Sequence, residues 1–271
     1  MIAALIRAAL LAVACSVGIA GASAQQASND YLPPKSVLVA KAPAQAGAPK
    51  TAQPQGGQKT VGLISIVGDS FMVKTVGVTV FGNEMTEIPI GGWKVDDRVA
   101  AKVTQMLSRN FRVKRIPVPA GTYAKYNAAN PQTDYREVRR KLVVDFASKQ
   151  PCDYYLLVAP GGSQVGDTNQ GIGGIGTLRT TVLFNPVQHV FALTELTVYD
   201  PKFERLRWEY GTIGQARIFV AIKGPNQKLE DNQHLPQDPQ AATNDPRARQ
   251  IALDLLDKSL AVTVPKVLAV E

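Results

Sequence analysis

Apolar and polar positions along residues 60–271 follow two different periods, and these periods predict the elements of the fold. Runs rich in Val, Ile, Phe and Tyr indicate β-strands. Segments in which apolar residues recur every three or four positions indicate amphipathic helices, expected to start near residues 96, 134 and 245. The predicted strands cover residues 60–67, 71–81, 111–118, 153–159, 178–184, 187–199 and 205–218.

The three expected helices carry start signals. Asp96 and Asp97 place negative charge at the positive end of the first helix. Asp134 and Glu137 form a capping-box pattern at the second helix, and Asp245 precedes a proline at the third. The buried face of the second helix is predicted to hold Tyr135, Val138, Leu142 and Phe146. The order β-β-α-β-α-β-β-β-β-α predicts an α/β (α+β) fold, a single domain with a mixed, mostly antiparallel sheet and about three packed helices.

Residues 1–59 differ in composition from the rest of the chain. Residues 8–20 form an apolar run that is too short to span a bilayer, and Ala22-Ser23-Ala24 has the small-x-small pattern of a signal-peptidase site. Residues 1–24 therefore predict a signal peptide and export to the periplasm or the extracellular space. Residues 25–59 are rich in Ala, Pro, Gln and Gly and predict a disordered linker ahead of an α/β domain over residues 60–271.

The two cysteines, Cys15 and Cys152, bear on anchoring and on disulfides. Residues 12–15 read Ala-Val-Ala-Cys, which resembles a lipoprotein box, although the usual Leu three residues before the cysteine is absent. In this alternative a lipidated Cys15 anchors the protein to a membrane, such as the outer membrane. Cleavage after residue 24 leaves Cys152 without an intrachain disulfide partner. Cys152 precedes a predicted core strand and is expected to be a buried, unreactive thiol.

The chain is basic, with a formal net charge of +8. Outside the cytoplasm this charge favours lipid headgroups, lipopolysaccharide or an acidic protein over nucleic acid as a partner. Arg136, Arg139 and Arg140 share a helical face by their spacing and are a candidate surface for an anionic partner, unless they form an ordinary solvated face. The two histidines are scattered and no Cys/His cluster has metal-ligand spacing, so we expect no metal and no cofactor.

The segment Gly68-Asp69-Ser70 follows an apolar run, as does the nucleophile of GDS-type (SGNH) esterases. Asp231 and His234 have the D-x-x-H spacing that supplies the other two triad residues in that family. However, strand signal continues after Ser70, where these enzymes need a loop and a helix, and their G-x-N-D block is missing. We therefore predict a β-hairpin turn at this segment, and an esterase that uses Ser70, Asp231 and His234 is the alternative.

Two further segments are predicted to be loops. Residues 171–176 match G-x-G-x-x-G, but they lie well after a strand and precede strand signal, which favours a flexible loop over residues 161–176 and not a dinucleotide site. Residues 223–244 form a long polar loop, which is expected to be either mobile or functional.

Several segments together resemble a known group of periplasmic α/β domains. They are DDRVAAKVTQML with FRVKRI, then CDYYLLVAPGG, and then LTELTVYDPKFERLRWEY. The group comprises the TolB amino-terminal region, the curli-secretion lipoprotein CsgG and penicillin-binding-protein activator lipoproteins, and the resemblance covers residues 60–210. It implies a similar fold and a role in binding protein partners at the envelope without enzymatic activity. It assigns no functional residues to this chain.

These patterns lead to one functional hypothesis and two alternatives. We expect an exported, non-catalytic binding or assembly-accessory protein of the bacterial cell envelope. It would contact a protein partner through a sheet edge, the arginine-rich helix or the loop at residues 226–244. The alternatives are the esterase and a module that binds anionic lipid or another polyanion through Arg136, Arg139 and Arg140.

Overall fold

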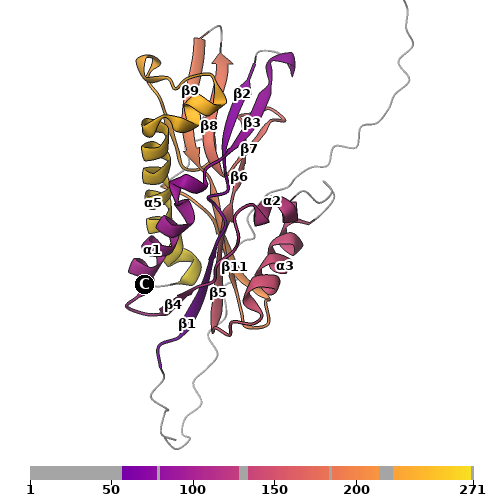
Figure 1. Cartoon of the computed structure of the whole chain (residues 1–271), viewed down its shortest axis with the longest axis vertical. Helices are drawn as coiled ribbons and strands as arrows, with labels where there is room; N and C mark the ends of the chain where they lie inside the picture. Colours follow the sequence, from indigo (N-terminus) through magenta and orange to yellow (C-terminus); the bar gives the residue numbers. More distant parts are fainter. Residues whose placement is uncertain (1–56, 78–79, 128–133, 183–184, 214–221, 270–271) are drawn as a thin grey trace, which may run out of the picture. The chain divides into compact units, whose positions relative to one another are not determined.

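Strands from distant parts of the sequence form two separate five-stranded sheets (Figure 1). The computed structural model describes residues 57–77, 80–127, 134–182, 185–213 and 222–269. These residues belong to one compact unit, Gln53–Glu271. The predicted signal peptide, residues 25–56 of the predicted linker and Cys15 lie outside the described residues, so the predictions about them stay predictions.

The first sheet, called sheet A, combines parallel and antiparallel pairs. Its strands, in spatial order, are β11 (Arg205–Tyr210), β10 (Thr194–Tyr199), β5 (Tyr154–Pro160), β1 (Thr60–Ser65) and β4 (Arg112–Arg115). β1 runs parallel to β4 and β5, whereas β10 is antiparallel to β5 and β11. The nearly continuous apolar sequence of β5 suits its central place, because a central strand is buried on both faces.

The second sheet, called sheet B, is also mixed. Its strands, in spatial order, are β12 (Asn226–Lys228), β9 (Asn185–Ala192), β8 (Ile175–Val182), β2 (Ser70–Val76) and β3 (Glu84–Pro89). β2 is parallel to β8, and the other pairs are antiparallel. A small third sheet joins β6 (Gly162–Gln164) to β7 (Gly171–Gly173). The predicted mixed α/β class is confirmed, with the strands divided between two main sheets instead of one.

The chain passes between the two main sheets several times, and two of these crossings, after β1 and between β9 and β10, fall within stretches of continuous strand signal. The hairpin predicted at Gly68-Asp69-Ser70 is therefore wrong. β1 pairs with β4 and β5, whereas β2 pairs with β3 and β8, so the two strands lie in different sheets. The predicted strand 187–199 is likewise two strands, separated at Leu193. Neither crossing is visible in the sequence, because strand signal is high on both sides of each.

A single carboxylate holds the link between β1 and β2. Asp96 accepts hydrogen bonds from Ser65 Oγ at 2.5 Å and from the main-chain N–H groups of Val67 at 2.9 Å and Gly68 at 3.2 Å. A Cβ on residue 68 would lie 2.8 Å from Asp96 Oδ2, so the close approach of this carboxylate explains the glycine. Asp96 thus does more than begin a helix, because it also fixes the path of the chain between the sheets.

Two segments predicted as loops contain regular structure. Residues 161–176 hold β6, β7 and the start of β8, so the prediction of a flexible loop is wrong. Residues 223–244 hold β12, the 3-10 helix Asp231–Gln233 and α4 (Pro239–Asn244). Short strands and single-turn helices need few apolar residues, which is why the polar composition of both segments concealed them.

The described residues contain five α-helices, and the three expected ones begin close to the predicted sites. The three expected helices are α1 (Val95–Leu107), α3 (Tyr135–Ala147) and α5 (Pro246–Leu268). The other two, α2 (Thr122–Asn127) and α4, are short. Asp134 and Asp245 cap α3 and α5 by accepting from the main-chain N–H two residues on, at 2.9 Å and 2.8 Å. Tyr135 is not on the buried face, since it is 57% exposed.

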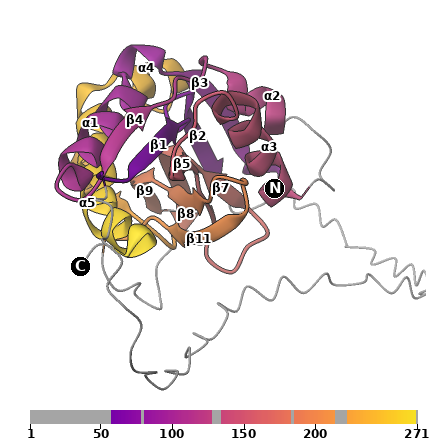
Figure 2. The same ribbon diagram turned by 90° about the horizontal axis from the view of Figure 1, so that it is seen from below.

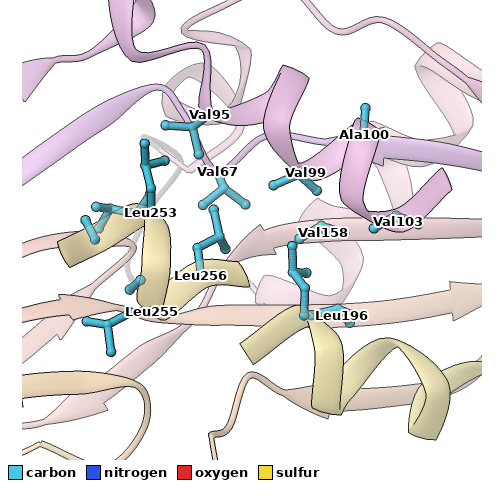
Figure 3. Packing of buried hydrophobic residues seen from close by; sticks show 14 of the residues in the cluster. Val67, Val95, Val99, Ala100, Val103, Val158, Leu196, Leu253, Leu255 and Leu256 are labelled. Atoms are coloured by element: carbon cyan, nitrogen blue, oxygen red, sulfur yellow. The ribbon is translucent and has the colours of Figure 1, made fainter. Parts of the chain in front are cut away.

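The largest apolar cluster contacts both main sheets and lies against α1 and α5 (Figure 3). It combines Val158 and Leu196 of sheet A with Phe71 and Val190 of sheet B, and Leu256 of α5 packs among them. A second cluster lies on the opposite face of sheet A, beneath α3. Seen from below, α1 and α5 lie on one side of the strands and α2 and α3 on the other (Figure 2). A single long helix, α5, therefore shares a core with both main sheets.

Candidate functional site

Strand β11 is an exposed edge of sheet A, and edge strand β3 of sheet B is exposed at as many positions. Every residue of β11 is exposed except Trp208, which is half-buried. The opposite edge of sheet A, β4, has the sequence Arg-Val-Lys-Arg, and such charge disfavours pairing with a further strand. In sheet B, edge strand β12 is three residues long, and edge strand β3 carries two glutamates and a proline. β11 is also charged, but it is longer than β4 and β12, and unlike β3 it has no proline and includes Trp208 and Tyr210, so the β11 edge is the candidate binding surface.

Main-chain geometry directs part of β11 away from its neighbour. In an antiparallel ladder, residue pairs that are hydrogen-bonded to each other alternate with pairs that are not. Gly211 donates its N–H to Thr194 O at 2.8 Å, so the pair of Gly211 and Thr194 is hydrogen-bonded. In this alternation Trp208, which is paired with Thr197, turns its N–H and C=O toward the open side of the sheet. Such an edge can accept the main chain of another strand.

The side chains of β11 give its two faces different chemistry. On the face shared with α3, the Arg205 guanidinium lies 5.9 Å from the centre of the Trp208 ring, and Tyr210 meets that ring edge-on at 5.1 Å. A register shift opposite Val198 leaves Leu206 as a bulge, 51% exposed. An aromatic and cationic stripe therefore lies along one side of the edge and an exposed leucine along the other.

The structure does not bring the three predicted esterase residues together. Ser70 Oγ donates to Glu87 Oε2 at 2.9 Å, and Ser70 is thus not idle in solvent as the hairpin prediction implied. Asp231 Oδ1 and His234 Nε2 are 4.0 Å apart, with Asp231 almost fully exposed. The 340 Å³ pocket lined by Ser70 also contains Asp69 and Glu87, but neither Asp231 nor His234 lines it.

Ser70 and His234 are separated by sheet B. Phe71 packs into the cluster under α5, so the preceding Ser70 points to the other face of the sheet. Leu235, the neighbour of His234, packs into that same α5 cluster and donates its N–H to Gln188 Oε1 at 2.7 Å. A nucleophile and its base must lie within hydrogen-bond reach, and this arrangement does not provide it.

The three arginines predicted to share an exposed face of α3 have different surroundings. Arg139 is 8% exposed, and its guanidinium contacts Glu195 at 2.5 Å and donates to Pro160 O at 2.9 Å. Arg140 forms a two-pronged contact with Glu137, at 2.8 and 2.9 Å. Arg136 is exposed. The prediction that all three form one anion-binding face is therefore wrong, because Arg139 belongs to the buried stripe of α3.

Burial shapes the charge state of the groups around Arg139. Burial acts against the charged guanidinium, but the interactions with Glu195 and Tyr123 together outweigh it and raise the pKa of Arg139 above its usual value. Tyr199 beneath α3 is buried, which raises the pKa of its hydroxyl to about 12. Burial also raises the pKa of the Tyr123 hydroxyl. At neutral pH this site holds one ion pair and two neutral phenols, an arrangement that suits packing.

The remaining groups with chemical potential are dispersed. Cys152 is a free, partly buried thiol whose pKa is raised by burial, as expected for an unreactive cysteine. Within the described ranges, no group of three or more His, Cys, Asp or Glu side chains could hold a metal ion. None of the helices in those ranges is both long and apolar enough to cross a bilayer.

Comparison with known proteins shows no family for this chain. No protein-family model and no curated protein matches the sequence. Among solved structures the chain is weakly similar to lipoprotein GNA1162 from Neisseria meningitidis, with 11% sequence identity and a TM-score of 0.24, over 77% of this chain and 99% of that chain. A TM-score this low carries no argument about fold or function. The resemblance to the TolB, CsgG and activator-lipoprotein domains thus stays a prediction.

The β11 edge was only partly visible in the sequence. A sheet edge was among the predicted contact surfaces, but the strand itself was predicted to extend to residue 218, whereas β11 ends at Tyr210. The available signal was the mixture of arginines and aromatics in residues 205–210, since a central strand is more uniformly apolar. That composition indicated an exposed strand, although it could not show which strand lies beside it.

Proposed function

We propose that this chain is an exported, non-catalytic accessory or assembly protein of the bacterial cell envelope that works by binding a protein partner. The observation that carries the proposal is the β11 edge, an exposed strand of which Trp208 presents main-chain groups to the open side. The signal-peptide pattern in residues 1–24 supports a location outside the cytoplasm.

The binding mode is the addition of a partner strand to sheet A. An extended segment lying along β11 forms main-chain hydrogen bonds, which provide affinity without regard to sequence. Side chains of that segment alternate between the two faces of the sheet, so specificity comes from the groups flanking the edge. On the α3 face these are Arg205, Trp208 and Tyr210, and Arg and aromatic residues are enriched where protein partners bind.

A pair of substitutions at one position tests this mode. Trp208→Ala removes the ring and keeps the outward N–H, whereas Trp208→Pro removes the N–H as well. Because that N–H does not pair with β10, the proline is expected to leave the β10–β11 ladder in place. The full exported chain, tagged and purified, is cross-linked in envelope extracts, and the captured partner is then titrated against each variant. Binding is expected to fall at least about tenfold further for the proline than for the alanine. The proline removes the main-chain hydrogen bond of residue 208 to the partner strand and disturbs the adjacent ones, whereas the alanine keeps them.

Two results decide the matter. Circular dichroism must first show that both variants retain the melting profile of the parent. Equal binding by the parent and a folded Trp208→Pro variant would refute docking at this edge, whatever the identity of the partner. Equal losses of binding for Trp208→Pro and Trp208→Ala would show that the partner recognises the Trp208 ring and does not add a strand to sheet A.

A further inference from the structure

An apolar pocket of 440 Å³ opens beside β11 on the sheet A face that α5 covers. Its apolar lining comes from Phe111, Tyr154, Val198, Leu206, Val267 and Leu268. Val198 and Val267 are almost fully buried at 3% and 1% exposure and form the floor, whereas Leu206 is exposed at the rim. Phe111 and Tyr154 meet edge to face with centroids 6.3 Å apart. The volume lies within the range of roughly 300–1,000 Å³ typical of small-molecule sites.

The polar part of the lining is cationic or neutral. It consists of Lys59, Asn110 and Arg207, and no carboxylate side chain lines the pocket. Neither Lys59 nor Arg207 forms an ion pair with another described residue. The nearby Asp153 already accepts from the N–H of Thr60 at 2.7 Å. Asp153 still attracts the Lys59 ammonium without an ion pair, and an incoming carboxylate would add to this attraction at Lys59 and meet Arg207 at the rim.

Lys59 is held in place at the mouth of the pocket. Its Nζ donates to the Tyr154 hydroxyl at 3.1 Å and lies 5.3 Å from the centre of that ring. This hydrogen bond raises the pKa of Lys59 above its usual value, so the ammonium stays charged at neutral pH. A cation fixed beside an apolar cavity is suited to an anion that is itself attached to an apolar group.

We propose that this pocket binds a single-chain amphiphile, with its aliphatic chain against Val198 and Val267 and its carboxylate at Lys59 and Arg207. Burial of the chain supplies most of the affinity, because each CH₂ group removed from water adds to it. The carboxyl-terminal end of α5 lies at Val267 and Leu268, and its carbonyls carry partial negative charge. The head is therefore oriented away from α5 and toward the two cations.

The pocket shares Leu206 and Arg207 with β11, but the proposal does not rest on partner docking there, and its test uses different probes. Isothermal titration of the purified full chain with monomeric decanoate is compared with decanol, which has the same chain and no charge. We expect saturable binding of decanoate and roughly tenfold weaker binding of decanol, because decanol lacks the carboxylate that would contact the two exposed cations. The variant Lys59→Gln/Arg207→Gln is expected to bind decanoate as weakly as decanol, with decanol affinity unchanged.

Matched variants separate the site from general effects of charge and folding. Arg136→Gln removes an exposed arginine that does not line the pocket, and it is expected to leave decanoate binding unchanged. Leu206→Trp places a larger ring at the exposed rim and is expected to weaken both probes. The proposal fails if decanol binds as tightly as decanoate to the parent, or if neither binds. It also fails if the chain floats with anionic phospholipid vesicles while showing no affinity for decanoate, because the ligand would then be a membrane surface.

Discussion

Arg139 shows how a single residue can reverse the meaning of a sequence pattern. Its spacing from Arg136 and Arg140 fits a shared basic face, yet it also lies three and four positions before Leu142 and Val143, which are buried. The structure follows the second relation, and the guanidinium pairs with Glu195 beneath α3 with both side chains about one-tenth exposed. The sequence shows that Arg139 is spaced both for the basic face and for the buried face of α3. It cannot show that Glu195 on β10 lies within reach, and this carboxylate is what makes burial of the guanidinium tolerable.

Breaking this ion pair is expected to destabilise the fold. Glu195→Gln or Arg139→Met leaves one buried charge without its partner, and we expect each to lower the free energy of unfolding by about 3–5 kcal/mol. The double variant Arg139→Met/Glu195→Gln removes both charges, so its loss is expected to be smaller than the sum of the two single losses. Urea denaturation followed by circular dichroism measures all three. Single losses below about 1 kcal/mol would show that the pair is solvated in solution.

At the scale of elements, the start of α1 holds the chain where it passes from β1 in sheet A to β2 in sheet B. Asp96 is the acceptor for three donors, Ser65 Oγ and the N–H groups of Val67 and Gly68. Asp96→Ala leaves those partly buried donors unsatisfied, and we expect it to lower the free energy of unfolding by about 1–3 kcal/mol.

The neighbouring Asp97 provides the control for this effect. It lies in the same helical turn and pairs with Arg115 at 2.6 Å, but its side chain is 55% exposed. Asp97→Ala therefore removes the same charge from the start of α1, and its cost is expected to be below about 1 kcal/mol. Chemical denaturation of both variants gives the difference. Equal losses would mean that Asp96 acts through the helix dipole alone and not as a clamp on the link.

Sequence predicted the helices better than the sheets, for a physical reason. Helix signals are local, because the capping residues Asp134 and Asp245 and the apolar stripes lie within the element that they define. Strand pairing depends on residues far apart in the chain. Nothing near Leu193 shows that β9 and β10 belong to different sheets, and nothing near Ser70 shows that Glu87 is its partner. The candidate edge at β11 is visible only after sheet A is assembled.

At the scale of the whole described unit, α5 connects the two sheets. It packs against the cluster that contains strands of both, and Arg98 of α1 pairs with Asp257 of α5 at 2.9 Å on the same side. The β11 edge and the neighbouring pocket lie on sheet A, next to the last turn of this helix. A partner strand at β11 and a ligand against α5 would therefore both contact elements that pack on one continuous core. Whether the two sheets unfold together is then a testable property of that core.

The two tryptophans of the chain report on the two sheets separately. Trp93 lies 5.1 Å from Phe71 of sheet B, and Trp208 lies on β11 of sheet A. Because α5 shares one core with both sheets, we expect Trp208→Phe and Trp93→Phe to unfold in urea with a fluorescence midpoint that matches the circular dichroism midpoint of the same variant. A fluorescence midpoint that departs from it in either variant would mean that one sheet opens before the other, and that a partner at β11 could be bound by sheet A alone.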